Sequence, residues 1–345
     1  MPRRRSRPSP PRTPPLPEAK QVVFVLQDDS LVLDWAGPAE ALRLASLEIA
    51  ALRLAVAPFA LRFVSAQPES TGSVGVRLQA LEPLPAALAD GSWVVLVGRT
   101  SAAEARPQTA QRELVAWLSR LAPGRAGLRL VTVCSGALLA ARAGLLDGRR
   151  ATTHHQHLDD LARLAPRCTV MQDRVFVQDG EVFTSAGVTA GIDLALHLIA
   201  AHAGELVAAR VAEQMAVALR RGPGDPELSP LLAHRQHLNA RLHRLQDALS
   251  LAPQEDWPLE RMADLAATTP RTLSRLFAQH AGTSPQAYLR GVRLAVAKRS
   301  LEAGASVAAA SEAGGFSSEL QLRRAWAAVG WPGSPSSARR QSQQA

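Results

Sequence analysis

Short apolar runs alternate with segments of helical spacing over residues 20 to about 205. Runs of this length and composition are typical of strands buried in a parallel sheet. Strands are expected at 22–26, 61–65, 93–98 and 128–133, and helices at 38–47, 113–121, 137–143, 191–203 and 205–219. A hairpin is expected where 175–177 and 182–185 flank Asp179-Gly180. The alternation predicts an α/β domain with a doubly wound parallel sheet and helices on both faces.

The segment from Arg220 to Pro226 is rich in glycine and proline and interrupts this pattern. Beyond it, only helical spacing remains. Helices are expected at 238–249, 259–266, 270–280, 285–301, 306–312 and 318–329. A short helix, a turn and a longer helix occur on each side of the long 285–301 helix. This pattern predicts an all-α domain with two helix-turn-helix units.

Composition limits the class of protein. Hydrophobic residues make up 47% and charged residues 20% of the 345 residues, which excludes wholesale disorder, collagen-like repeats and a coiled-coil rod. Two cysteines, Cys134 and Cys168, are too few for a disulfide scaffold or a multi-cysteine zinc module. No membrane span is expected, because no apolar run is long enough, and no secretory signal is expected, because no apolar run follows the basic N-terminus. A cytoplasmic protein without membrane contact, metal or other cofactor is expected.

The net charge of +9 is concentrated at the two ends of the chain. Residues 1–20 hold six basic side chains and one acidic, and residues 241–345 hold thirteen basic and eight acidic. A basic C-terminal part fits a polyanionic partner. The expected divisions are a disordered Pro/Arg-rich tail (1–19), an α/β domain (20–205), a helical connector and linker (206–237) and the helix-turn-helix domain (238–340).

The predicted helix that begins near Thr269 has one apolar side and one basic side. Thr269 is a favourable N-cap, and Pro270 is a favourable first helical residue. The apolar side consists of Leu273, Leu276 and Phe277. The opposite side carries Arg271 and Arg275, with Thr272 and Ser274 at its edges. Such a helix can enter a major groove, where arginine donates two hydrogen bonds to guanine. A solvated face on an ordinary bundle helix would show the same pattern.

Further residues continue from this helix at fixed spacing: Met262-Ala263, Gly282, Ser284-Pro285, Tyr288, Arg293-Leu294, Ala297 and Gly315-Phe316-Ser317-Ser318. On these residues, segment 238–340 resembles the AraC-type DNA-binding domain. The resemblance implies two recognition helices that enter successive major grooves of double-stranded DNA. It implies base contacts by Arg271, Ser274 and Arg275, with Thr272 beside them, in the first unit, and by Gln321 and Arg324 in the second.

The second unit departs from the family pattern. Leu322 and Trp326 stand where phenylalanines are usual, and Ala338 stands in place of tyrosine. Ala310 is small for a core position. Loose packing of the second recognition helix is therefore expected.

The strand expected at 128–133 runs directly into Cys134-Ser135-Gly136 and a helix. A side chain at such a turn projects at the carboxyl ends of the strands, where ligands bind. Helix-start N–H groups lower a thiol's pKa and can hold an oxyanion. Asp34 and the exposed N–H of Gly98 can reach the same crevice, and His154 and His155 offer bases. Such a set is compatible with a nucleophilic site. On spacing alone, a small buried cysteine at a tight turn is the favoured interpretation.

Residues 20 to about 205 carry a second family pattern: Leu33-Asp34-Trp35-Ala36-Gly37-Pro38, Val133-Cys134-Ser135-Gly136-Ala137, Ala143 to Gly148, Ala151-Thr152-Thr153-His154, Thr184-Ser185-Ala186-Gly187 and Asp193 to Leu196. On these residues the segment resembles the DJ-1/PfpI family, of the class I glutamine amidotransferase-like fold. The order of the two parts is similar to that of the GlxA-like transcriptional regulators. The resemblance implies a flavodoxin-like sheet and a domain that senses a small metabolite without turning it over.

The same resemblance implies a ligand site made of Asp34, Gly98, Arg99, Cys134, Ser135 and His154. Arg99 stands where a second glycine is usual, so it either blocks an oxyanion site or clamps a carboxylate ligand. His155 stands where tryptophan is usual, which makes the wall of the site more polar.

Three hypotheses follow. The first is a bacterial transcription regulator that binds its operator as a homodimer, with no catalytic residue. Its small-molecule effector belongs to a class such as amino acids or quaternary amines, which the resemblance implies. The second is a Cys134-dependent hydrolase, hydratase or glyoxalase-like enzyme. The third is a chaperone or stress protein whose C-terminal part has no specific affinity for DNA.

Overall fold

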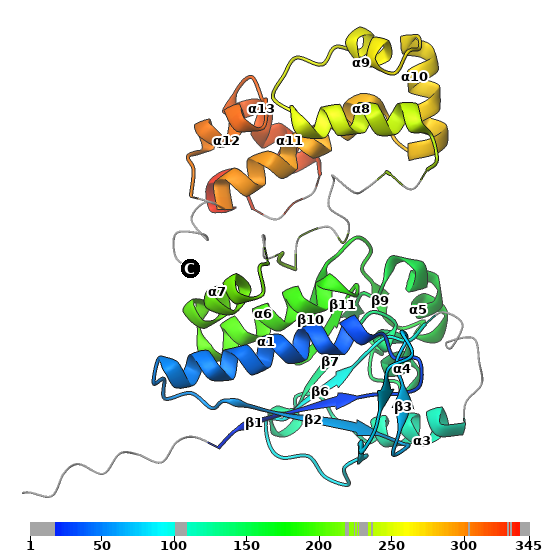
Figure 1. Cartoon of the computed structure of the whole chain (residues 1–345), viewed down its shortest axis with the longest axis vertical. Coiled ribbons are helices and arrows are strands. Elements are labelled where there is room, and N and C mark those ends of the chain that lie inside the picture. Colours follow the sequence, from blue (N-terminus) through cyan, green and yellow to red (C-terminus); the bar gives the residue numbers. More distant parts are fainter. Residues whose placement is uncertain are drawn as a thin grey trace, which may run out of the picture.

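The computed structural model describes residues 18–100, 109–217, 221–223, 225, 227, 234–235, 237–302, 304–329, 331 and 333–338. All but the last two residues of the expected disordered tail, 1–19, lie outside this part. The described residues form an N-terminal α/β part and a C-terminal helical part (Figure 1). None of the helices in the described part combines the length and the apolar character that crossing a bilayer requires.

A seven-stranded sheet forms the centre of the N-terminal part, in the order β10-β11-β7-β6-β1-β2-β5. All neighbouring strands are parallel except the hairpin of β10 and β11. The strands are β1 (Lys20–Val25), β2 (Phe59–Ser65), β5 (Glu82–Pro83), β6 (Trp93–Leu96), β7 (Arg129–Val133), β10 (Phe176–Asp179) and β11 (Val182–Ser185). The prediction of a doubly wound parallel sheet is confirmed.

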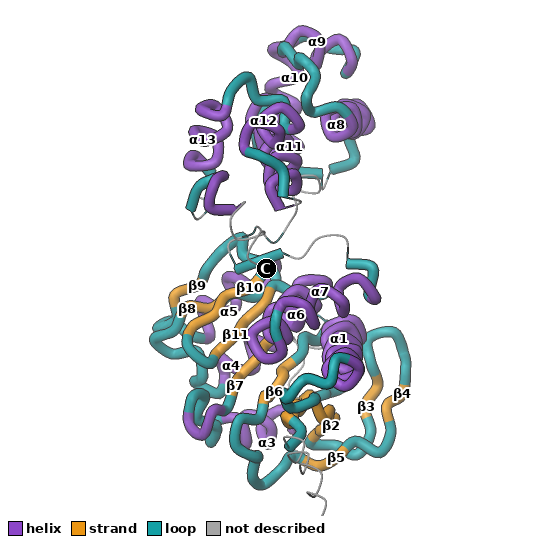
Figure 2. The backbone as a smooth tube through the Cα atoms, turned by 90° about the vertical axis from the view of Figure 1, so that its left-hand side faces the viewer, coloured by secondary structure: helices purple, strands orange, loops and turns teal. Residues whose placement is uncertain are grey.

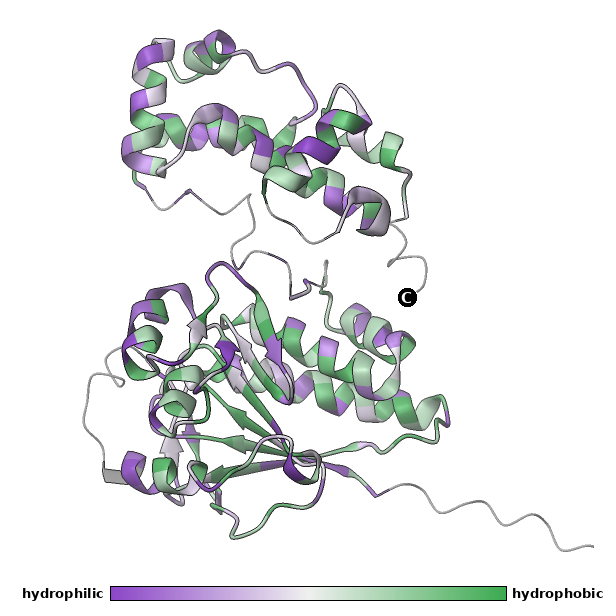
Figure 3. Ribbon diagram, turned by 180° about the vertical axis from the view of Figure 1, so that it is seen from behind, coloured by the Kyte–Doolittle hydropathy of each residue, from purple (hydrophilic) through white to green (hydrophobic). Residues whose placement is uncertain are grey.

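Helices cover both faces of this sheet (Figure 2). One face carries α1 (Val32–Ala51), α6 (Thr189–Ala203) and α7 (Glu205–Gln214), and the other carries α3 (Thr109–Leu118), α4 (Gly136–Arg142) and α5 (Leu158–Leu164). Successive β1 residues supply the two cores in turn, with Val22 and Phe24 on the α1 side and Val23 and Val25 on the α4 side. A strand buried on both faces must be apolar at every position, which explains the continuous apolar runs. In Figure 3 these central strands are mostly green, the colour of hydrophobic residues.

Several short elements were not expected from the sequence. They are the hairpin of β3 (Ser70–Thr71) and β4 (Arg77–Leu78), the parallel pair of β8 (Arg150–Ala151) and β9 (Thr169–Val170), β5 and α5. Helix α7 ends at Gln214, earlier than expected, and buries Val207, Ala208, Val211 and Ala212 in the core that α1 and α6 share. The packing of the N-terminal part thus extends beyond residue 205.

The C-terminal part contains two small hydrophobic cores joined by one helix, α11 (Pro285–Glu302). Tyr288, Leu289 and Val292 of α11 belong to the first core, with α8 (Ala240–Leu251), α9 (Leu259–Leu265) and α10 (Pro270–Leu276). Leu294, Ala297 and Leu301 belong to the second core, with α12 (Val307–Ala313) and α13 (Glu319–Ala328). A short π-helical turn, Phe277–Ala281, follows α10. The two expected helix-turn-helix units are therefore present, and α11 connects them by packing in both cores.

Arg293 and Gly315 hold the two units against each other. The Arg293 guanidinium donates to the carbonyl oxygens of Pro253 and Glu255, each at 2.8 Å. Gly315 has a φ of 70° in the left-handed region, and a Cβ there would lie 2.6 Å from the Cα of Gln254. The backbone of the second unit therefore lies directly on the 253–255 loop of the first, which only glycine permits.

We expect Gly315→Ala to destabilise the protein more than Gly304→Ala does. Gly304 also has a positive φ, 89°, but its Cβ would meet nothing within 4 Å. The control therefore carries only the left-handed backbone cost of about 1–2 kcal/mol, while Gly315→Ala adds a backbone clash. Urea unfolding of both variants measures the difference. Equal losses would show that the contact with the 253–255 loop contributes nothing.

Candidate functional site

Cys134 occupies the sharp turn between β7 and α4. Its φ of 55° lies in the left-handed region, which is strained for a residue with a side chain. Two hydrogen bonds hold the turn: the Cys134 N–H donates to Ser185 O at 3.1 Å, and Thr153 Oγ1 donates to Cys134 O at 2.8 Å. The conformation expected of a strand-to-helix elbow is therefore present, at the carboxyl end of β7.

Asp34, in the first turn of α1, lies at the centre of this arrangement and is fully buried. Its carboxylate accepts from the N–H of Gly98 at 3.2 Å, from the N–H of Val188 at 2.9 Å and from the Cys134 thiol. Burial outweighs these hydrogen bonds and raises the pKa of Asp34 to about 6. The Gly98 N–H, which was expected to be exposed, is instead taken by Asp34. That expectation is wrong.

The Cys134 thiol is closed off and protonated. Cys134 is only 4% exposed. Gly187 lies so close in space that a Cβ on it would be 2.9 Å from the sulfur. Burial raises the pKa of the Cys134 thiol, and the negative charge of Asp34 raises it further. The expectation that the helix start lowers this pKa is wrong, because the one hydrogen bond from the Ser135 backbone is too weak to offset burial.

Ser135 and Arg99 are bound to each other. The Arg99 N–H donates to Ser135 Oγ at 2.9 Å, and this hydroxyl donates back to Arg99 O at 3.3 Å. The Arg99 side chain is 2% exposed, and its Nε donates to the Asp28 carbonyl at 2.8 Å. Both side chains therefore stabilise the crossing of the loops after β6 and β7.

His154 lies beside this cluster and is half-buried. It follows Thr153, which bonds Cys134, and its Nδ1 accepts from the Gln156 N–H at 3.4 Å. Burial lowers the pKa of His154, so it is neutral near pH 7. Within the described part of the chain, His154 makes no hydrogen bond to Cys134 or Asp34. Its neighbour His155 bonds the Glu227 carboxylate through Nδ1 at 2.9 Å.

The structure thus brings Asp34, Gly98, Arg99, Cys134 and Ser135 together, with His154 at the margin. Sequence reasoning assigned no role to Thr153, Gly187, Val188 or Glu227. The Ala186-Gly187 pair was part of the recognised pattern, but nothing in the sequence pointed to Glu227.

A separate hollow of about 290 Å³ lies near the amino ends of β6 and β7, lined by Trp117, Arg120 and loop 85–90 among others. Ligands of open α/β sheets bind at the carboxyl ends, so the Cys134 edge is the stronger candidate.

Helix α10 presents its two arginines to solvent. Leu273 and Phe277 are fully buried, while Arg271 and Arg275 are exposed on the other side. No carboxylate in the described ranges forms an ion pair with either guanidinium. Thr269 caps the helix by accepting from the Thr272 N–H, as expected, and it donates to Thr272 Oγ1 at 3.0 Å. Ser274 is half-buried, and its hydroxyl donates to Pro270 O at 3.0 Å, so only its lone pairs remain for DNA.

Helix α13 packs more tightly than expected. Leu322 is fully buried and Trp326 is 3% exposed, and the Trp326 ring lies edge-on to Trp331 at 4.7 Å. Trp326 belongs to the second core together with Ala310 and Leu322, and Trp331 and Ala338 pack against this core. Arg324 is exposed. Gln321 is exposed too, but its Oε1 accepts from the N–H and hydroxyl of Ser317 at 2.8 and 3.1 Å, which caps the helix.

Both parts of the chain are similar to known proteins. The DJ-1/PfpI family model matches residues 20–201, and a helix-turn-helix domain model matches residues 262–330. The HTH-type transcriptional regulator CdhR of Pseudomonas aeruginosa is 34% identical over 216 residues, 62% of this chain and 63% of CdhR. The HTH-type transcriptional regulator GlxA of Rhizobium meliloti is 33% identical over 225 residues, 63% of this chain and 67% of GlxA. The isonitrile hydratase of Pseudomonas putida is 45% identical over 97 residues, 28% of this chain and 40% of that enzyme.

The fold and the site define a protein with an α/β domain of the flavodoxin-like type followed by two helix-turn-helix units. The chain belongs to the DJ-1/PfpI family, and its C-terminal part contains a helix-turn-helix domain. The chain spans less than two thirds of the length of CdhR.

We expect Asp34 to make folding stability depend on pH. The fold raises the pKa of Asp34 from 3.8 to about 6. Between these two pH values, the folded protein holds a proton on Asp34 that the unfolded chain has released. The stabilisation is complete below about pH 4 and is lost as pH rises through about 6, by on the order of 3 kcal/mol. Asp34→Asn cannot titrate. Urea unfolding of both proteins at pH 4.5 and 7.5 should show the wild type losing stability relative to the variant; a difference that stays constant with pH would contradict the assignment.

Proposed function

We propose that this chain is a sequence-specific DNA-binding transcription regulator controlled by a small-molecule effector. Residues 20–205 form the sensing domain, 206–237 the connector and 238–340 the DNA-binding domain, with α7 packed on the sensing domain. Two relatives that bear the name of HTH-type transcriptional regulators support this proposal. A homodimer fits the function, because two chains double the phosphate contacts.

The observation that carries the proposal is the orientation of α10. A buried apolar stripe fixes the helix, so Arg271 and Arg275 lie exposed on one side, one helical turn apart. Exposed arginines at this spacing near the start of a second helix can reach guanine edges in a major groove. Arg324 on α13 supplies the corresponding group in the second unit, while Gln321 must release Ser317 before its amide oxygen can contact a base.

We expect Arg271→Ala and Arg275→Ala each to weaken binding to the selected operator by about 1–3 kcal/mol and to relax the base preference at one position. Neither side chain packs in the core, so folding should be unchanged. Gel-shift titrations on operator and on random duplex at fixed salt measure both effects. Arg43→Ala, on the exposed surface of α1, is the control. An equal loss on random DNA would contradict base reading and indicate phosphate contacts only.

The sensing role rests on the chemistry around Cys134. The Asp34 carboxylate, the Cys134 thiol and the backbone of Val188 form one hydrogen-bonded cluster that links α1, β7 and α6. Val188 is strained at a φ of 50° and is 39% exposed, so it lies at the accessible margin of the cluster beside a buried interior. A ligand that contacts this margin and breaks the Val188–Asp34 hydrogen bond would release the strain and shift α6. Such a shift of a preformed equilibrium is what effector control requires.

A contiguous set of contacts leads from α6 to the DNA-binding domain. Arg221 of the connector pairs with Asp193 of α6 at 2.7 Å. Four residues on, Asp225 O accepts from the Val175 N–H at 3.0 Å, and its carboxylate pairs with Lys298 of α11 at 2.9 Å. Lys298 also pairs with Glu302. Since α11 joins both helix-turn-helix units, a shift of α6 reaches both recognition helices through this connector.

The alternative function is a Cys134-dependent hydratase or hydrolase. The match to an isonitrile hydratase over 97 residues favours it, as does the thiol beside a carboxylate. The raised pKa of the Cys134 thiol and its burial oppose it, because the thiolate is the nucleophile.

We expect Cys134 to be a poor nucleophile. In a Cys168→Ser chain, iodoacetamide at pH 7.5 should label native Cys134 at least about 100-fold more slowly than the same chain unfolded in urea, because both burial and thiolate fraction oppose the reaction. Mass spectrometry of timed samples gives the rates. Labelling of the native chain faster than of the unfolded chain would favour the enzyme and contradict a purely sensing role.

A further inference from the structure

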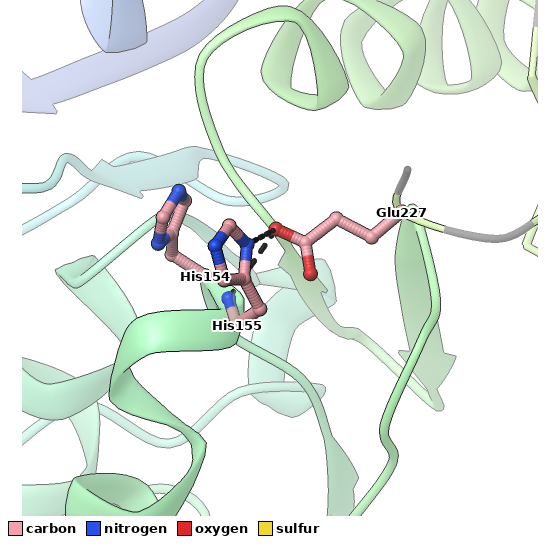
Figure 4. Close-up of side chains that lie close together, drawn as sticks. All are labelled: His154, His155 and Glu227. Atoms are coloured by element: carbon pink, nitrogen blue, oxygen red, sulfur yellow. Dashed lines mark hydrogen bonds and ion pairs between the residues drawn. The ribbon is translucent and has the colours of Figure 1, made fainter. Parts of the chain in front are cut away.

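Three side chains with metal-binding atoms meet at one point outside the Cys134 cluster (Figure 4). His154 and His155 belong to the start of a short 3₁₀ turn, η2 (His155–His157), after β8, and Glu227 belongs to the connector. One ligand atom from each residue lies within 4.8 Å of the other two. The cluster therefore joins the N-terminal domain to the segment that leads to the DNA-binding domain.

The backbone holds Glu227 in place for this contact. The Glu227 N–H donates to Asp173 Oδ1 at 3.1 Å, and the Glu227 carbonyl accepts from Arg221 at 2.9 Å. The carboxylate Oε1 accepts from the His155 N–H at 3.3 Å and lies 2.9 Å from His155 Nδ1. The Glu227 side chain is 10% exposed and that of His155 is 34% exposed. The carboxylate is thus fixed beside the imidazoles, and solvent still reaches them.

The donor set selects the kind of cation. Two imidazole nitrogens with one carboxylate oxygen are a set that Zn²⁺ takes in proteins, whereas Ca²⁺ and Mg²⁺ prefer oxygen ligands only. Ligand atoms around tetrahedral zinc lie about 3.3 Å apart, given bond lengths of about 2.0–2.1 Å. The His155–Glu227 pair at 2.9 Å already has nearly that separation. Side-chain rotation of His154, whose ring lies 4.1 Å from that of His155, can close the remaining gap.

The local charge also favours a cation. Asp173 adds a second carboxylate next to Glu227, and Arg174 beside it offsets part of the charge of Asp173. The charge of Arg221 is offset by its ion pair with Asp193 at 2.7 Å.

We propose that His154, His155 and Glu227 bind a divalent cation of the zinc class at the junction of the sensing domain and the connector. The ion takes the place of the hydrogen bond between His155 Nδ1 and the Glu227 carboxylate, and the neutral imidazole then carries its one proton on Nε2. Three protein ligands leave a fourth position for water or a small ligand. Bound metal ties the connector to the η2 turn. The site does not depend on the proposed regulation of DNA binding.

Metal binding tests this directly in the full-length protein after treatment with a chelator. Titration with ZnCl₂ against a chromophoric chelator should show one equivalent bound with Kd below about 1 µM. His155→Ala should weaken binding about 100-fold or more, and Glu227→Gln about 10–100-fold. Glu227→Gln keeps an oxygen that accepts the His155 hydrogen bonds, so the connector stays docked. In wild type, Zn²⁺ should also slow exchange of the Val175 amide, which donates to Asp225 in the connector.

His243→Ala is the matched control. The rings of His237 and His243 lie 4.3 Å apart, similar to those of His154 and His155, but among the described residues they form no metal-binding group with an acidic side chain. This variant should bind Zn²⁺ as the wild type does. Three results would each overturn the proposal. The first is unchanged affinity for Zn²⁺ in His155→Ala and Glu227→Gln, the second is loss of Zn²⁺ binding in His243→Ala, and the third is a wild type that binds Zn²⁺ no more tightly than about 100 µM. The contact would then be only a hydrogen bond that docks the connector.

Discussion

Helix α11 passes through two separate hydrophobic cores, and the arrangement of the two helix-turn-helix units depends on it. Its first half buries Tyr288 and Val292 with α10, and its second half buries Leu294 and Leu301 with α13. An 18-residue helix is about 27 Å long, and the two units are arranged along this length. Because each core is small, neither unit would fix its recognition helix without the shared element.

The Cys134 elbow retains the geometry of a nucleophile but not its chemistry. Asp34 accepts two backbone hydrogen bonds and the thiol hydrogen bond in a fully buried position. Burial raises the pKa of both the Asp34 carboxyl and the Cys134 thiol, and the charge of ionised Asp34 further opposes formation of the thiolate. The thiol of such a cluster is a poor nucleophile, but the cluster links three elements, α1, β7 and α6. That property suits a sensor better than a hydrolase.

The sequence predicted the main strands, the helices and the outward face of α10, because apolar periodicity and caps determine them locally. It also placed Asp34, Gly98 and Cys134 at one sheet edge, since the carboxyl ends of parallel strands meet there. It failed for the N–H of Gly98 and for the Cys134 pKa, because both depend on how deeply the loops bury Asp34. Glu227 had no signal at all: its contact with His155 spans 72 residues and needs the connector to return to the domain.

The central claim is that one chain reads two adjacent stretches of duplex DNA through α10 and α13. Selection of bound sequences from a random duplex pool with the full-length protein tests it most directly. Two enriched blocks of bases with centres about 10–10.5 base pairs apart are predicted for each chain bound. Recovery of sequences without enrichment, or of a single block at each bound chain, would contradict the account.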